Sequence, residues 1–227
     1  MLQFLLLGLI SFSVQAEVFK YEGIATIKGK TVYTEKHEYT TNEKGEVVES
    51  KTLYLGVNGE TVGDLKNDYR PSLSLPEHRM EDNRRKNYHG VRYIDGKIQL
   101  FNQNKNEKEE TEFIENNPKK GLMVASQGLH YYVVSNFEKM KVKDFTLQFL
   151  IPGRLDSYRF VWNYLGKDKD GLEEFEVKID NWILRMFAPS LLMKYHPETK
   201  RLIYYKGLSN IEDDKGEMMN VEINYKY

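Results

Sequence analysis

Cysteine is absent from the 227 residues of this sequence. A chain without cysteine forms no disulfide, offers no thiolate to a metal ion and has no cysteine nucleophile. Lipid attachment after signal cleavage is also excluded, because it needs a cysteine at the new N-terminus. We therefore expect a soluble mature protein whose fold depends on its apolar core.

An excess of charge of either sign is also missing. Lys and Arg number 33 and Asp and Glu number 34, so the formal net charge is −1. Domains that bind nucleic acid usually carry a strong excess of basic residues on one face. The balance predicts that nucleic acid is not a partner.

Long apolar runs are absent after the first residues. The segment from Phe4 to Phe12 is apolar, and Val14-Gln15-Ala16 places small residues at the −3 and −1 positions of a cleavage site. This order is typical of a secretory signal peptide. The alternative, a retained membrane anchor, needs a longer apolar span. We expect residues 1–16 to be a signal peptide and the mature chain to be exported, periplasmic or secreted, with no integral membrane span.

Turn signals divide the remaining chain, residues 17–227, which we expect to form a single β-rich domain. A glycine after a polar residue adopts a positive φ without steric strain, which allows the chain to reverse in a tight turn. Such pairs recur at Lys44-Gly45, Asn58-Gly59, Asp95-Gly96, Asp170-Gly171 and Lys215-Gly216. Their spacing favours a series of hairpins over alternating helices and strands.

Apolar residues alternate with polar ones between several of these turns. Alternation with a period of two residues gives each strand one apolar face and one solvated face, as in an antiparallel sheet covered on one side. The pattern predicts strands at Phe145–Ile151, Tyr158–Tyr164, Phe175–Ile179 and Val221–Tyr227.

Helix is expected only as a minority element. The apolar residues from Leu122 to Met140 are spaced by three or four, which predicts a helix lying on the sheet. A helical turn is also expected at Asn181–Phe187, before Pro189. The charged stretch Glu77–His89 is interpreted as an exposed loop, and Asn102–Lys120 as a solvated hairpin end or loop. The fold class is thus mainly β, a strongly curved antiparallel sheet in an open half-barrel around one or two helices.

No catalytic residue is assigned. Gly207-Leu208-Ser209-Asn210-Ile211 lacks the second glycine of a hydrolase nucleophile elbow, so we interpret Ser209 as the end of a strand. The five histidines have no metal-ligand spacing, and no pair of carboxylates stands out for acid–base chemistry. We expect no enzymatic activity, no metal and no cofactor.

Aromatic residues are abundant, with 16 Tyr, 11 Phe and 2 Trp. On the two neighbouring strands predicted around Ile151–Ser157, the large apolar residues share one parity and therefore one face. We call them the aromatic stripe, and they are the candidate ligand-binding residues: Phe145, Leu147, Phe149, Tyr158, Phe160, Trp162 and Tyr164. The stripe either belongs to the hydrophobic core or lines an apolar cleft that binds a lipid or another apolar molecule.

Two stretches, Phe149–Phe160 and Tyr195–Gly207, resemble exported bacterial proteins of uncharacterised function that share the open half-barrel of periplasmic lipoprotein carriers and receptors (LolA/LolB-like). The resemblance extends from Leu122 to Tyr227. It implies a strongly bent antiparallel sheet around a helix, with an apolar concavity suited to acyl chains. It transfers no site residues, and the absence of a lipidated cysteine departs from the membrane-bound receptor type.

Three function classes therefore remain. The first is a soluble, non-enzymatic binding protein that carries a lipid or other apolar ligand in the concave face. The second is a structural or interaction protein of the cell envelope with a filled core and no small-molecule ligand. The third, an enzyme, would need a convergent polar cluster inside the cavity, which the sequence does not reveal.

Overall fold

The computed structural model describes residues 16–141, 145–181 and 190–227, and these form one sheet of 15 strands with two short helices. The prediction of a mainly β fold is confirmed. The signal-peptide segment and the helical turn expected at Asn181–Phe187 lie outside the described residues, apart from Ala16 and Asn181 themselves.

The first half of the chain is a run of strands. They are β1 (Val18–Ile27), β2 (Lys30–Thr41), β3 (Val47–Leu55), β4 (Thr61–Asp68), β5 (Glu77–Asp82), β6 (Asn87–Ile94), β7 (Lys97–Gln103) and β8 (Glu110–Ile114).

The middle of the chain holds the helical elements. They are a 3₁₀ turn at Pro118–Lys120, then after β9 (Leu122–Val124) the helices α1 (Gly128–Ser135) and α2 (Phe137–Met140).

The second half returns to strands. They are β10 (Phe145–Ile151), followed by a 3₁₀ turn at Pro152–Arg154, then β11 (Asp156–Lys167), β12 (Glu173–Ile179), β13 (Leu191–Tyr195), β14 (Leu202–Glu212) and β15 (Met218–Lys226).

Most strands pair antiparallel with their neighbours in sequence. The order across the sheet is β8-β7-β6-β5-β4-β3-β2-β1-β15-β14-β13-β12-β11-β10-β9, so the first and last strands pair in its middle. The edges are β8 and β9, and β9 pairs parallel with β10. The hairpin turns have the expected glycines at positive φ, for example Gly59 at 85° and Gly96 at 74°.

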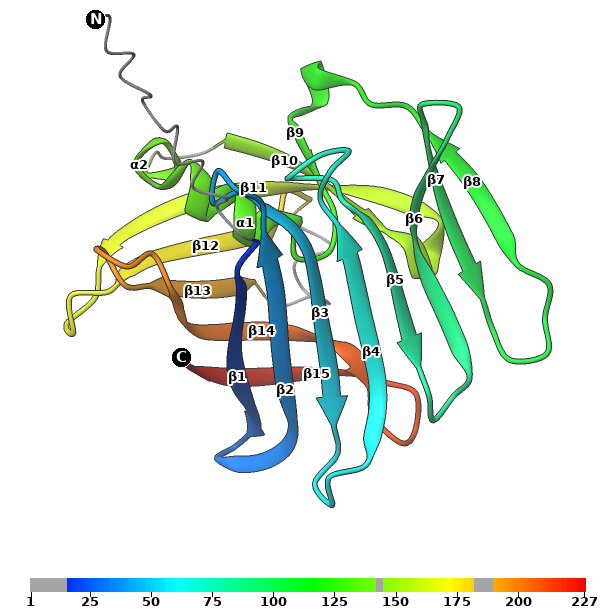
Figure 1. Ribbon diagram of the computed structural model, residues 1–227, viewed down its shortest axis with the longest axis horizontal. Coiled ribbons are helices and arrows are strands. Elements are labelled where there is room, and N and C mark those ends of the chain that lie inside the picture. The colour runs from blue at the N-terminus through cyan, green and yellow to red at the C-terminus, as the bar shows by residue number, and fades with distance from the viewer. Residues whose placement is uncertain (1–15, 142–144, 182–189) are drawn as a thin grey trace, which may run out of the picture.

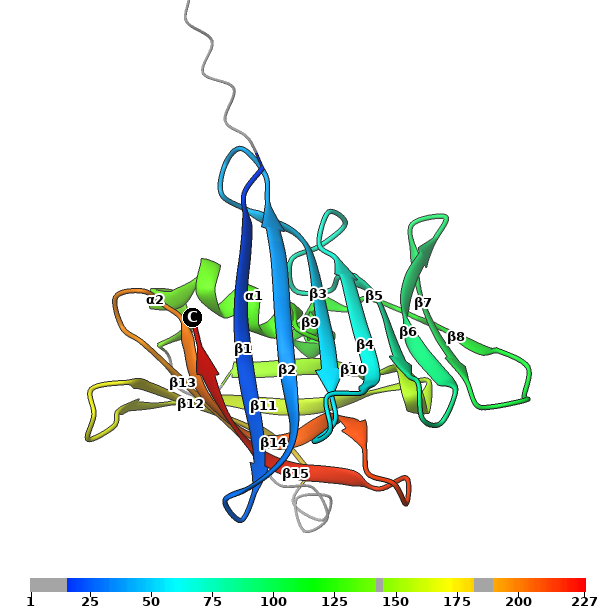
Figure 2. The same cartoon turned by 60° about the horizontal axis from the view of Figure 1, so that its bottom comes forward.

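The sheet folds over so that its two halves face each other. In Figure 1 the strands β1–β8 run across the direction of β10–β15, and α1 and α2 lie near one end between the two sets. Figure 2 shows β1–β5 in front of α1 and β10. The face of β1–β5 turned toward the helices is therefore the inner face, and the opposite one is the outer face.

Three apolar clusters fill the space between the halves. One packs Leu129 and Phe137 of the helices against β10–β14. A second joins β1–β5 to β14 and β15, with Tyr33 and Tyr54 almost without exposed surface. The third packs residues of β6 and β7 against Leu150 and the β9 region. Burial of apolar surface on this scale is the main stabilising term for such a sheet.

The helix predicted from Leu122 to Met140 is shorter than expected. Its first three residues form β9 and pair with β10, and helix begins only at Gly128. A side chain is excluded at Gly128, because a Cβ there would lie 2.3 Å from the carbonyl oxygen of Ser74. The apolar spacing was correct for α1 and α2 but not for the edge strand that precedes them.

The stretch Glu77–His89 is not an exposed loop, as its charges suggested, but the strand pair β5–β6 with a turn at residues 83–86. On β5 the charged residues Glu77, Arg79 and Glu81 lie on the outer face, while His78 and Met80 are buried. The expected loop at Asn102–Lys120 likewise contains β8, which pairs with β7.

The turn between β5 and β6 is held by the distant turn between β14 and β15. Arg85 forms an ion pair with Glu212, with 2.8 Å between Nε and Oε2. Arg84 donates to the Glu212 carbonyl and pairs with Asp214 at 3.2 Å. These contacts connect the two halves of the sheet at the side away from α2.

Candidate functional site

The aromatic stripe lies on the two adjacent strands that the sequence predicts. Strands β10 and β11 are antiparallel neighbours, and the cross-strand pairs are Phe145↔Trp162, Leu147↔Phe160 and Phe149↔Tyr158. The short connection at Pro152–Arg154 makes this register possible.

The centre of the stripe is core. Leu147 and Trp162 have no exposed surface and belong to the cluster that includes α1 and α2. The indole of Trp162 donates to the carbonyl oxygen of Met140, with 2.9 Å between Nε1 and O. Around this centre, four members of the stripe are partly buried against the same cluster: Phe145, Phe149, Phe160 and Tyr164. Tyr158, at the far end, is half-buried.

An ion pair between the partly exposed Lys141 and the buried Glu173 closes the end of the stripe at Tyr164. The Tyr164 hydroxyl donates to Glu173 at 2.6 Å, and Lys141 lies 2.9 Å from the other carboxylate oxygen. Burial raises the pKa of Glu173, but the hydrogen bonds from Tyr164 and Lys141 outweigh it and leave the pKa below its usual value. The carboxylate therefore stays charged beside the core, and no local pattern along the chain reveals this contact.

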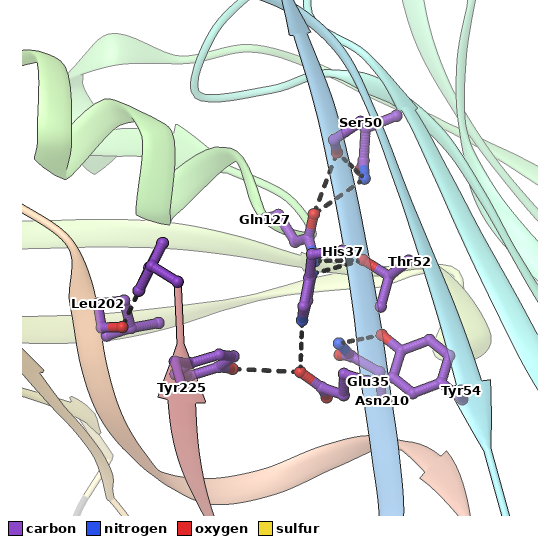
Figure 3. Close-up of polar contacts among 11 residues, drawn as sticks. Glu35, His37, Ser50, Thr52, Tyr54, Gln127, Leu202, Asn210 and Tyr225 are labelled. Carbon is purple, nitrogen blue, oxygen red and sulfur yellow. Dashed lines mark hydrogen bonds and ion pairs between the residues drawn. The ribbon is translucent and has the colours of Figure 1, made fainter. Parts of the chain in front are cut away.

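A second feature of the inner face is a buried polar network around His37, which Figure 3 shows. The imidazole lies between Glu35, 2.8 Å from Nε2, and Thr52, 2.9 Å from Nδ1. Gln127, just before α1, donates to the Thr52 hydroxyl at 2.9 Å and accepts from Ser50 at 3.1 Å. The network joins the start of α1 to strands β2 and β3.

The order Thr52, His37, Glu35 has the chain of contacts of a hydroxyl nucleophile, a base and an orienting acid. The burial of the Thr52 hydroxyl argues against nucleophilic chemistry at this position. Thr52 has no exposed surface and its hydroxyl is already held by Gln127. The ring of Tyr21 covers His37 in parallel, with 4.3 Å between the ring centroids. The arrangement can fix the position of α1, but a substrate cannot approach the hydroxyl without displacing that packing.

The sequence carries a signal for this network that alternation alone could have found. Glu35 and His37 share the parity of Tyr33 on β2, and that parity is the inner one. Charged groups on an inner face are expected to be paired and hydrogen-bonded.

Ser209 lies within β14 and does not end the strand, which continues to Glu212. Its buried hydroxyl donates to the carbonyl of Ile211, two residues further along the same strand, where the β14–β15 pairing is irregular. His78 and His89 are both packed on the inner side, where burial lowers their pKa values to about 3 and about 4. Within the described ranges, no group of three or more His, Asp or Glu side chains is arranged to hold a metal ion.

The outer face of the sheet has a hollow of about 590 Å³, on the side opposite the helices. Charged side chains of β3, β4 and β5 form much of its lining, and Phe101 of β7 contributes an apolar part. These residues are not among the candidate ligand-binding residues predicted from the sequence.

A scan against protein-family models, a search of curated proteins and a search of solved structures gave no match to this chain. The resemblance to lipoprotein carriers therefore stays a prediction. Among residues 16–141, 145–181 and 190–227, no helix has both the length and the apolar character needed to cross a bilayer.

Proposed function

We propose that this protein is an exported, non-enzymatic interaction protein whose concave side is filled by its own side chains. In this proposal the sheet is an open half-barrel closed by α1 and α2, and partners bind elsewhere on the surface. The observation that carries it is the burial of Trp162 and Leu147 under the helices. A ligand could reach these two side chains only by displacing α1 and α2.

The inner polar network supports the same proposal. Its hydroxyl, imidazole and carboxylate groups are engaged with one another, and Tyr21 and Gln127 cover them. A catalytic site needs a position about 3 Å from its nucleophile where a reacting atom can lie. At Thr52 the side chain of Gln127 already occupies that position, 2.9 Å from the hydroxyl.

A carrier of lipid or another apolar ligand is the second candidate. It is favoured by the Tyr158 end of the stripe, where Phe149, Phe160 and Tyr158 keep part of their surface exposed. An acyl chain against these rings would gain about 0.8 kcal/mol for each buried methylene. The resemblance stated from the sequence also favours this candidate.

Lipid binding distinguishes the two candidates. The protein, purified without detergent, is examined by native mass spectrometry and titrated with the fluorescent fatty acid cis-parinaric acid. The interaction protein predicts no co-purified lipid and no saturable fluorescence change. Saturable binding that Phe160→Ala weakens, while the surface variant Lys36→Gln does not, would contradict it and establish the carrier.

A further inference from the structure

The charges on the outer face of β3, β4 and β5 are sorted into two rows. Lys51 is directly opposite Lys66, which is directly opposite Arg79. We call these the basic row. Two residues away on the same strands, Glu49 is opposite Asp68, which is opposite Glu77. We call these the acidic row.

Within each row, the like charges on β3, β4 and β5 lie directly opposite one another, which disfavours the pairing of these strands. Like charges directly opposite on neighbouring strands destabilise the pairing, whereas opposite charges stabilise it. Exchanging the acid and the base on β4 alone would create favourable pairs with both neighbours. A local arrangement that works against stability is expected mainly at functional sites.

The side chains of the two rows form their ion pairs on the sides that face away from each other. Lys66 pairs with Asp64 at 3.2 Å and Arg79 with Glu81 at 2.5 Å, both on the side away from the acidic row. Arg70 holds Glu49 and Asp68 from the other side. Among the described residues no ion pair joins the two rows. Lys51 forms no ion pair within this described part of the chain, although Glu38 lies opposite it on β2, because Glu38 pairs with Lys20 at 2.9 Å. The hollow of about 590 Å³ opens between them.

The floor of the hollow is backbone. It follows the row Ser50, Asn67, His78 and Val91, which lies between the charged rows. These side chains point to the inner face, because successive residues of a strand face opposite sides. At one end the ring of Phe101 lies on Gly90, where a Cβ would be 2.6 Å from the ring. The Arg92 guanidinium lies 4.9 Å from the centre of that ring.

The geometry points to a binding site for a short extended peptide in this hollow, with acidic side chains toward Lys51, Lys66 and Arg79 and basic side chains toward Glu49, Asp68 and Glu77. An extended peptide sends successive side chains to opposite sides, so alternating charges match two opposite walls. Volumes of about 300–1,000 Å³ are usual for small-ligand sites. The site deepens the proposed function and rests on it, because it supplies the partner-binding surface outside the filled interior.

The length of the peptide follows from the strand spacing. Strands β3 to β7 are four steps of about 4.8 Å apart, roughly 19 Å in all. A fully extended chain rises about 3.4 Å per residue, so about six residues span the hollow. An aromatic residue at the last position would reach the Phe101 end, where the Arg92 guanidinium, which lies over the buried Phe101 ring, offers a cation–π contact.

Two isomeric peptides test the site by titration calorimetry at low salt. Acetyl-Lys-Glu-Lys-Glu-Ser-Phe-amide places its lysines on one side and its glutamates on the other when extended. Acetyl-Lys-Lys-Glu-Glu-Ser-Phe-amide has the same composition but mixes the charges on each side. We expect the alternating peptide to bind at least tenfold more tightly, and its affinity to fall as salt screens the charges.

The matched protein variants are Lys51→Gln/Lys66→Gln, in the basic row, and Lys36→Gln, on the outer face of β2 and away from the hollow. The double variant should lose at least tenfold in affinity for the alternating peptide, and Lys36→Gln should keep it. The double variant removes the repulsion between Lys51 and Lys66 and also the exposed Lys66–Asp64 ion pair, effects of opposite sign that are each worth about 1 kcal/mol at most, so its thermal unfolding should stay close to that of the native protein.

Equal affinity for the two isomers, unchanged affinity in the double variant, or no heat of binding with either peptide would each overturn the site. These outcomes are separate from the lipid titration. A protein that binds neither the peptides nor cis-parinaric acid loses this site but not the filled interior. A protein that binds the fatty acid in a Phe160-dependent way loses the proposed function whatever the peptides do.

Discussion

Replacing Gln127 by leucine should destabilise the protein by about 2–3 kcal/mol. The side chain donates to Thr52 at 2.9 Å and accepts from Ser50 at 3.1 Å and from Asn67 at 3.4 Å. Each such bond contributes about 1 kcal/mol net. Thr52, Ser50 and Asn67 each keep at least one other hydrogen-bond partner, so the full cost of an unsatisfied buried group does not arise.

The assay is urea unfolding followed by far-ultraviolet circular dichroism, with the free energy taken from the midpoint and slope. The matched control is Gln148→Leu, because Gln148 is only partly buried and makes one hydrogen bond, to Ser157. We expect that variant to lose about 0.5–1.5 kcal/mol. If Gln127→Leu costs no more than Gln148→Leu, the inner network does not hold α1 to the sheet and the reasoning is refuted.

Three further predictions concern the core, the histidines and the contact between the turns. Trp162→Ala should lower the free energy of unfolding by about 3–5 kcal/mol, measured in urea; a loss under 1 kcal/mol would indicate an open cleft. Burial lowers the pKa of His78 to about 3, whereas an unfolded histidine titrates near 6.5. Between these values the unfolded state binds more protons, so stability should fall as the pH decreases from about 6.5, and His78→Leu should reduce that fall between pH 7 and 5; an unchanged pH profile would contradict it. A double-mutant cycle on Arg85 and Glu212 should give a coupling of about 0.2–1 kcal/mol that high salt removes, and a coupling insensitive to salt would contradict a surface ion pair.

The hairpins were predictable because their signals are local. Alternation predicted β10 and β11, and the short connection between them predicted that they are antiparallel neighbours. The glycine turns needed only a residue that accepts positive φ. These features depend on a few neighbouring residues, so one sequence is enough to recognise them.

The remaining features depend on contacts between distant segments. Leu122–Val124 continues the apolar spacing of the helix, and only its position beside β10 makes it a strand. The charges of Glu77–His89 resemble a loop because the outer face of β5 is solvated, while Met80 on its inner face packs against Ile211 and Val221, far along the chain.

The two candidate sites differ in the same way. The stripe follows from parity within two adjacent strands, but its burial depends on α1 and α2. The basic and acidic rows appear only when β3, β4 and β5 are placed in register. No segment of the sequence contains either row, so no local pattern could reveal it.

The most direct measurement of the filled interior is the solvent accessibility of Trp162. The chain has two tryptophans, and Trp182 lies outside the described residues. In a Trp182→Phe variant the tryptophan fluorescence therefore reports on Trp162 alone. The account predicts a blue-shifted emission that iodide does not quench and that added palmitate does not alter. Emission at the wavelength of exposed indole, quenched by iodide and protected by palmitate, would contradict the filled interior.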